Sequence, residues 1–148
     1  MKARTITISD KVINGCVTIQ VNSNFEKFSR FILANCHESE KDEHKNQLPN
    51  HQHANGLCVP VKNKHGQQGY LIWIRAFDWS VRSMGVLTHE LTHYIMRQFE
   101  QSNIPVRLEN DEIFAYFLEY YQREAFWRLR KFAPDLKKKI KHKKHAKV

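Results

Sequence analysis

Two histidines four residues apart, with a glutamate after the first, are the residues of this chain best suited to do chemistry. They lie in the segment His89-Glu90-Leu91-Thr92-His93, a His-Glu-x-x-His motif. On a helix, positions i and i+4 lie on one face about one turn apart. Both imidazoles can then reach one cation at the ~2.0–2.1 Å of a zinc–nitrogen bond. Glu90 projects toward the same open site, where it can take a proton from a zinc-bound water as a general base.

The surrounding sequence must be helical for this geometry to arise. Asp78 and Ser80 are both suited to cap the N-terminus of a helix. Core-facing positions then recur at spacings of three and four, as in an amphipathic helix, at Val81, Met84, Thr88, Leu91 and Ile95. No proline interrupts the segment before Pro105, and we expect the helix to end within residues 98–103. The alternative interpretation is that the histidines are half-buried helix residues and that Glu90 is a solvated charge.

A catalytic zinc site needs a third protein ligand and keeps its fourth position for water. Acids are the candidates, because no histidine follows His93 until His142 and no His-x-x-Gly-x-x-His extension is present. These acids are Glu109, Asp111, Glu112, Glu119 and Glu124. A second helical pattern opens at Asn110, and a short connection would bring its first turn toward the histidine pair. We therefore predict Glu112 as the third ligand, with Glu109 as the alternative. Either acid can instead only cap the helix and balance its dipole.

These residues resemble the gluzincins, zinc peptidases in which a glutamate of the following helix is the third ligand. The likeness rests on the His-Glu-x-x-His motif and on Glu112 within the segment Asp111-Glu112-Ile113-Phe114-Ala115-Tyr116. The Glu-x-x-Ala spacing is similar to that of prophage-repressor-cleaving metallopeptidases and of small metallopeptidases encoded in phages and prophages. The resemblance covers roughly Tyr70 to Trp127. It implies a Zn²⁺ cofactor, a protein or peptide substrate, a cytoplasmic or virion-associated location, Glu90 as the base, and the ligands His89, His93 and Glu112.

Tyr116 is a departure from the gluzincin pattern. Many gluzincins carry an aspartate four residues beyond the ligand glutamate, where it orients a histidine ligand, and this chain has Tyr116 there. Tyr116 lies one turn after Glu112 and shares its helix face, so its hydroxyl is a candidate to stabilise an oxyanion. Tyr94, beside His93, is a weaker candidate for the same role. Both tyrosines can alternatively be packing residues.

The remaining pattern predicts an α+β domain, and the resemblance to gluzincins implies that this domain is of minimal zincin-like type. Apolar, alternating segments indicate strands at residues 5–9, 16–21, 56–61 and 70–77, and a helix is predicted over 24–35. The order strand, strand, helix, strand, strand, helix, helix predicts a small antiparallel sheet packed against helices. In zinc peptidases of this kind, a sheet edge beside the cleft binds the substrate backbone by strand addition. We expect the polar stretch from Glu38 to Asn55 to be a long loop, a flap over the cleft.

Cysteines and histidines crowd around this polar stretch, at Cys36, His37, His44, His51, His53 and Cys58. Such residues can hold zinc, but their spacing matches no compact motif, so we favour a loop over a second metal site. The three cysteines, odd in number and widely spaced, favour a reducing compartment over a disulfide framework.

Length and charge predict one domain with a basic tail. We place the domain at residues 1–133 and the tail at 134–148. Residues 128–148 hold ten Lys and Arg and one acid, a net charge of +9, whereas residues 1–127 hold fourteen of each sign and are neutral. Such a tail can bind nucleic acid or an acidic surface, or can only raise solubility. No apolar segment indicates a signal peptide or a membrane span, so we expect no membrane partner.

Together these observations favour a zinc-dependent peptidase. One alternative is a non-catalytic zinc-containing scaffold, or a phage structural or interaction protein, that retains the zincin fold. A further alternative is a nucleic-acid-associated module in which the motif is incidental.

Overall fold

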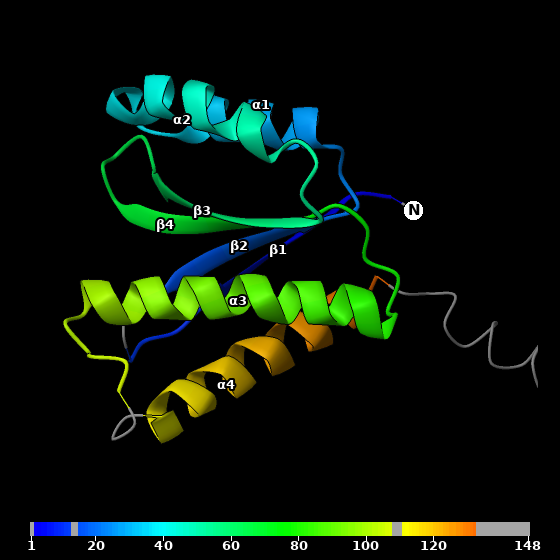
Figure 1. Cartoon of the computed structure of the whole chain (residues 1–148), viewed down its shortest axis with the longest axis vertical. Helices are drawn as coiled ribbons and strands as arrows, with labels where there is room; N and C mark the ends of the chain where they lie inside the picture. The colour runs from blue at the N-terminus through cyan, green and yellow to red at the C-terminus, as the bar shows by residue number, and fades with distance from the viewer. Residues whose placement is uncertain (1, 13–14, 108–110, 133–148) are drawn as a thin grey trace, which may run out of the picture.

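A computed structural model describes residues 2–12, 15–107 and 111–132 (Figure 1). The described residues form one mixed sheet of four strands with helices on both faces, which confirms the predicted α+β class. The strands are β1 (Arg4–Ser9), β2 (Cys16–Val21), β3 (Gly56–Lys62) and β4 (Gln68–Ile74). The helices are α1 (Phe25–Asn35), α2 (Lys41–Gln47), α3 (Val81–Gln101) and α4 (Asp111–Arg130), and 3₁₀ turns at Glu38–Glu40 and Leu48–His51 flank α2.

The strand order is β1-β2-β4-β3, and the predicted all-antiparallel sheet is wrong. The pairs β1–β2 and β3–β4 are antiparallel hairpins, but β2 pairs with β4 in parallel. The reason is the connection after β2, which crosses one face of the sheet through α1 and α2 and enters the sheet at its edge as β3. The chain then turns back into the centre, so that β4 runs in the same direction as β2.

The central strand β4 is buried on both faces, which explains its nearly continuous apolar sequence. Tyr70, Ile72 and Ile74 contribute to the core under α3 and α4. Trp73 points to the opposite face, where it stacks on Phe28 of α1 with ring centroids 5.8 Å apart. The protein therefore has two layers of buried side chains, one between the sheet and α3 and α4, and one between the sheet and α1.

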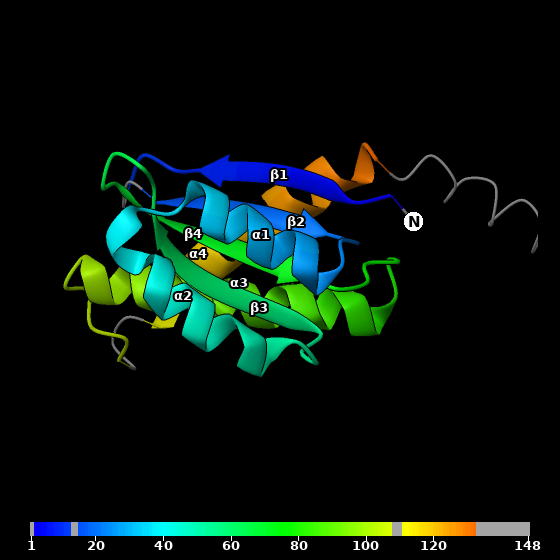
Figure 2. The ribbon, with the colours of Figure 1, turned by 90° about the horizontal axis from the view of Figure 1, so that it is seen from above.

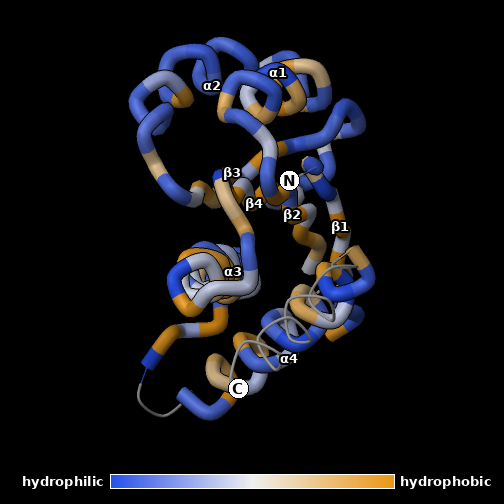
Figure 3. Tube along the Cα trace, turned by 90° about the vertical axis from the view of Figure 1, so that its right-hand side faces the viewer, coloured by the Kyte–Doolittle hydropathy of each residue, from blue (hydrophilic) through white to orange (hydrophobic). Residues whose placement is uncertain are grey.

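The polar stretch after α1 is helical, so the predicted long loop is wrong. Side-chain pairs three and four residues apart support α2, with Lys45 Nζ 2.9 Å from Asp42 Oδ1 and Gln47 Nε2 2.9 Å from Glu43 Oε1. Figure 2 shows α1 and α2 together on one face of the sheet, and Figure 3 shows α3 and α4 on the other. This stretch cannot serve as a flap over α3.

The long helix α3 begins where its sequence indicates. Ser80 is the N-cap and accepts a hydrogen bond from the Ser83 N–H at 3.2 Å, and α3 ends at Gln101, within the predicted range. Of the predicted core positions, Leu91 and Ile95 are buried. Val81 is 84% exposed, because the buried face of α3 instead includes Leu87, Tyr94 and Phe99. No helix among the described residues is long and apolar enough to cross a membrane.

Candidate functional site

His89 and His93 lie on an exposed face of α3, with their rings turned toward each other. Their Nε2 atoms are 3.1 Å apart and their ring centroids are 4.6 Å apart. Two nitrogens bound to one zinc ion at ~2.0–2.1 Å and a tetrahedral angle would lie about 3.3 Å apart. A hydrogen bond between the two neutral rings also gives this distance. The pair therefore fits two positions of a zinc site, and neither histidine is half-buried as the alternative interpretation required.

Glu90 is only 6% exposed and is not a solvated charge. Its carboxylate accepts a hydrogen bond from the backbone N–H of Cys58 in β3. Burial raises the pKa of Glu90, and the smaller effects of His89, the Cys58 N–H and Arg97 oppose that rise. Burial, with the positive charges of His89 and Arg97, lowers the pKa of His93. The motif thus combines a pair of exposed nitrogens with a buried carboxylate that favours its protonated form more than an ordinary glutamate does.

Gly56 at the start of β3 lets the strand approach α3 closely. A Cβ atom at this position would lie 2.7 Å from Glu90 Oε1 and 2.8 Å from both Glu90 Cγ and Val86 Cγ1. These distances are shorter than real Cβ contacts, so any larger residue would displace the glutamate side chain. Sequence reasoning missed this role, although a glycine within a strand is a known sign of close backbone approach.

The structure does not bring the predicted third ligand to the histidine pair. Glu112 lies exposed in the first turn of α4, where its backbone N–H donates to Asp111 Oδ1 at 2.8 Å. Within the described residues, no group of three or more histidine, cysteine, aspartate or glutamate side chains is gathered to hold a metal ion. This finding applies equally to the cysteines and histidines between residues 36 and 58. Glu109, the alternative ligand, lies outside the described residues.

The other acids that were candidates lie elsewhere on α4. Glu119 Oε1 is 3.7 Å from Arg123 Nη1, and Glu124 Oε2 is 3.2 Å from Arg128 Nη2. Both acids therefore form ion pairs one turn away on their own helix.

Neither predicted oxyanion-stabilising tyrosine contacts the histidine pair. Tyr116 is 66% exposed, and its ring packs edge-on against Phe117 with centroids 6.1 Å apart. Tyr94 is fully buried, and its hydroxyl is 2.8 Å from that of Tyr121, which in turn donates to Asp10. Tyr94 is therefore a core residue, as the packing alternative proposed.

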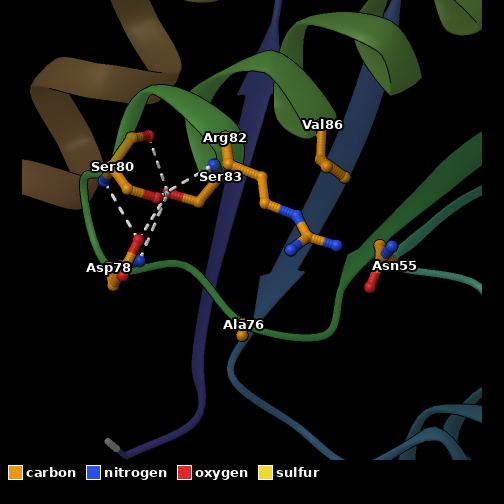
Figure 4. Close-up of a pocket in the computed structure, with 7 residues that line it drawn as sticks. All are labelled: Asn55, Ala76, Asp78, Ser80, Arg82, Ser83 and Val86. Atoms are coloured by element: carbon orange, nitrogen blue, oxygen red, sulfur yellow. Dashed lines mark hydrogen bonds between the residues drawn. The ribbon is translucent and has the colours of Figure 1, made fainter.

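A pocket of about 240 Å³ opens at the N-terminal end of α3 (Figure 4). It is lined by Asn55, Ala76, Asp78, Ser80, Arg82, Ser83 and Val86. Hydrogen bonds from Ser80 and Ser83 to the Asp78 carboxylate hold its pKa at about 2. The Arg82 side chain extends across the pocket between Val86 and Asn55. Because Val86 is one turn before Glu90, the pocket adjoins the candidate base.

Comparison with protein-family models, with curated proteins and with solved structures finds no match to this chain. The resemblance to gluzincins therefore rests on the quoted residues, and the functional interpretation rests on the geometry of the site itself.

Proposed function

We propose that this protein is a zinc-dependent peptidase in which His89 and His93 hold the metal and Glu90 is the general base. One observation carries the proposal: two exposed imidazole nitrogens 3.1 Å apart lie on the same helix as a carboxylate buried against the neighbouring strand. The proposal assigns no role to Tyr94.

The proposal takes Glu112 as the third ligand, by resemblance to gluzincins. The helices that carry these residues are packed together, since Gln122 Nε2 of α4 lies 2.7 Å from Thr88 Oγ1 of α3. Glu112 does not join the pair in the described structure, so metal binding must recruit it. The Glu112 side chain is exposed, and its carboxylate has no ion-pair partner among the described residues.

Zinc held at this position would polarise a peptide carbonyl and lower the pKa of a water molecule. Glu90 would take a proton from that water and pass it to the leaving amine. Its burial beside the rings suits this role, because a carboxylate with a raised pKa accepts a proton more readily. The pocket beside Val86 would receive a side chain of the peptide substrate.

Metal analysis and substitution of Glu90 test the proposal. The purified protein, reconstituted with zinc, should bind one equivalent, and H89N or H93N should lose it. E90Q should retain the zinc and lower the hydrolysis of a peptide library by about 10²–10⁴-fold. E112Q should weaken zinc binding, whereas E119Q on the same helix is a matched control that should not. Absence of stoichiometric zinc, or full activity in E90Q, would overturn the proposal.

A second candidate function is a non-catalytic zinc-containing scaffold, including a phage structural or interaction protein. The observation that favours it is that the Glu90 carboxylate already has a hydrogen-bond partner in β3, as a purely structural acid would. Wild-type protein that binds zinc but cuts no member of a broad peptide library would select the scaffold. The basic segment 134–148, with its proposed nucleic-acid or acidic partners, lies outside the described residues.

A further inference from the structure

The outer edge of β3, the strand that contacts Glu90, forms hydrogen bonds with side chains. Alternate residues of an edge strand direct their N–H and C=O groups away from the sheet. At Cys58 the N–H donates to Glu90, and the carbonyl accepts from Arg97 Nη1 at 3.2 Å. Both outward groups of Cys58 are thus held by α3.

The rest of this edge offers little to a pairing strand. Lys62 donates its N–H to Glu40 Oε2 at 2.7 Å and accepts from the His37 N–H at 2.7 Å. Pro60, between Cys58 and Lys62, has no N–H to donate. The resemblance to gluzincins implies that a substrate backbone adds to a sheet edge beside the cleft. At Cys58 such a strand could add only by displacing Glu90 and Arg97.

We propose that Arg97 is the positioning residue for the candidate base. It holds the carbonyl of Cys58, so that the N–H of the same residue stays directed at the Glu90 carboxylate. The catalytic consequence of this inference rests on the proposed function, but the contact itself does not.

The helix geometry supports this coupling. Glu90 and Arg97 are seven residues apart, which is about two turns, so they share one face of α3. The N–H and C=O of one strand residue point to the same side, so two side chains from one helix face can bind both groups. Gly56 leaves the space that the Glu90 side chain occupies beside β3, because a Cβ there would lie 2.7 Å from Glu90 Oε1. With Arg97 in place, the Cys58 N–H stays directed at the carboxylate in that space.

Hydrogen exchange of the Cys58 amide, measured by NMR on the full chain, tests the coupling without any need for activity. This amide donates to Glu90, so its exchange rate reports the contact directly, and E90A gives the rate without it. We expect R97Q to speed Cys58 exchange by at least about tenfold, toward the E90A rate, because a charge-assisted hydrogen bond is lost. R97K should stay near wild type, as should R123Q, a matched arginine substitution on α4.

The exchange of Val59 separates positioning from general loosening, because its amide pairs with β4. An unchanged Cys58 rate in R97Q, or equal acceleration of Val59, would overturn the inference. R97M, which keeps the apolar stem, replaces R97Q if that variant fails to fold.

The catalytic readout uses the zinc-loaded protein. R97Q should lower kcat by about tenfold with KM and zinc content unchanged, and R97K should restore most of it. Unchanged kcat in R97Q would overturn the catalytic part of the inference. If the wild type hydrolyses nothing, the proposed function fails, while the exchange rates still decide whether Arg97 positions Glu90.

Discussion

At the β1 edge of the sheet, the carbonyls of Thr7 and Ser9 accept hydrogen bonds from Arg128 Nη1 at 2.8 Å and from the Tyr120 hydroxyl at 3.3 Å. Both donors belong to α4. At the β3 edge, α3 covers Cys58 with the Glu90 carboxylate and the Arg97 guanidinium. Covering an edge protects it from pairing with other chains in both cases. Only at β3 does the covering side chain belong to a motif that can do chemistry.

The difference shows that the same kind of contact, a hydrogen bond from a helix side chain to an edge strand, can contribute to stability at β1 and to the geometry of the site at β3. The β1 donors contact carbonyls far along the chain from the histidine pair. The β3 acceptor is Glu90, next to His89, so a change in the backbone of β3 is transmitted to the candidate site. The following predictions test whether this distinction holds.

The largest expected contrast is in the reactivity of Cys16 and Cys58. Cys16, beside the β1 edge, is exposed, whereas burial raises the pKa of the Cys58 thiol to about 12. At pH 8 only about 10⁻⁴ of Cys58 would be thiolate, the nucleophilic form, and this fraction would rise about tenfold with each pH unit until the pH reaches that pKa. We expect iodoacetamide to alkylate native Cys16 at least about a thousandfold faster than Cys58, as measured by peptide mass spectrometry. Equal labelling of the native protein would mean that the β3 edge opens readily.

Replacement of Gly15 by alanine should give the largest loss of stability. Its Cβ would collide with the hydroxyls of Tyr94 and Tyr121 and with the Asp10 carboxylate, which form one hydrogen-bonded group. Overpacking of this kind costs about 1–3 kcal/mol of unfolding free energy, measurable by urea denaturation. Gly85 on α3 has open space around it, so G85A should be neutral or stabilising. A stable G15A would show that this region can rearrange.

Replacement of Gly56 by alanine should affect function more than stability. The new methyl group would displace the Glu90 side chain, which is flexible and can move without unfolding the strand. We expect G56A to retain zinc and to lose about tenfold in hydrolysis, as misplacement of a catalytic group does. The control is G69A on β4, where a Cβ would be 3.8 Å from the Val61 carbonyl oxygen, an ordinary contact. Equal effects of the two substitutions would refute a special role for Gly56.

The smallest expected effect is that of R128Q at the β1 edge. It removes the hydrogen bond to Thr7 and the ion pair with Glu124, both partly exposed, at a cost of less than about 1 kcal/mol. Zinc content should be unchanged, as in R97Q, and hydrolysis should also be unchanged, in contrast to R97Q. If R128Q impaired hydrolysis as R97Q does, the two edges would not differ in the way described.

Local sequence was sufficient for much of the fold. The spacing around Leu91 and Ile95 and the cap at Ser80 predicted α3, and with it the exposed histidine pair, because these features depend on neighbours within a few residues. The helical stretch of α2 was missed because its polar residues have no apolar periodicity and are stabilised by pairs such as Asp42 with Lys45.

Features that depend on distant segments could not be derived. The parallel pairing of β2 with β4 follows from the route of a long connection, which has no local signature. The position of Glu112 depends on how α4 packs on α3. The contact of Glu90 with Cys58 depends on Gly56, which lets β3 approach α3 closely. Residue types thus indicated which side chains could do chemistry, whereas only the tertiary structure showed which of them meet.

The parallel pairing of β2 with β4 has a consequence for how the chain folds. Val17 pairs with Tyr70 and Val21 with Ile74, so each pair closes a loop of 53 residues (70 − 17 and 74 − 21). The two hairpins on either side close much shorter loops and should form earlier, since the entropic cost of closure grows with loop length. We expect joining of the hairpins to limit the rate of folding. The two imidazoles lie one turn apart on the same helix, so they can approach each other as soon as α3 forms. Glu90 acquires its partner, the Cys58 N–H, only when α3 packs on the edge of β3.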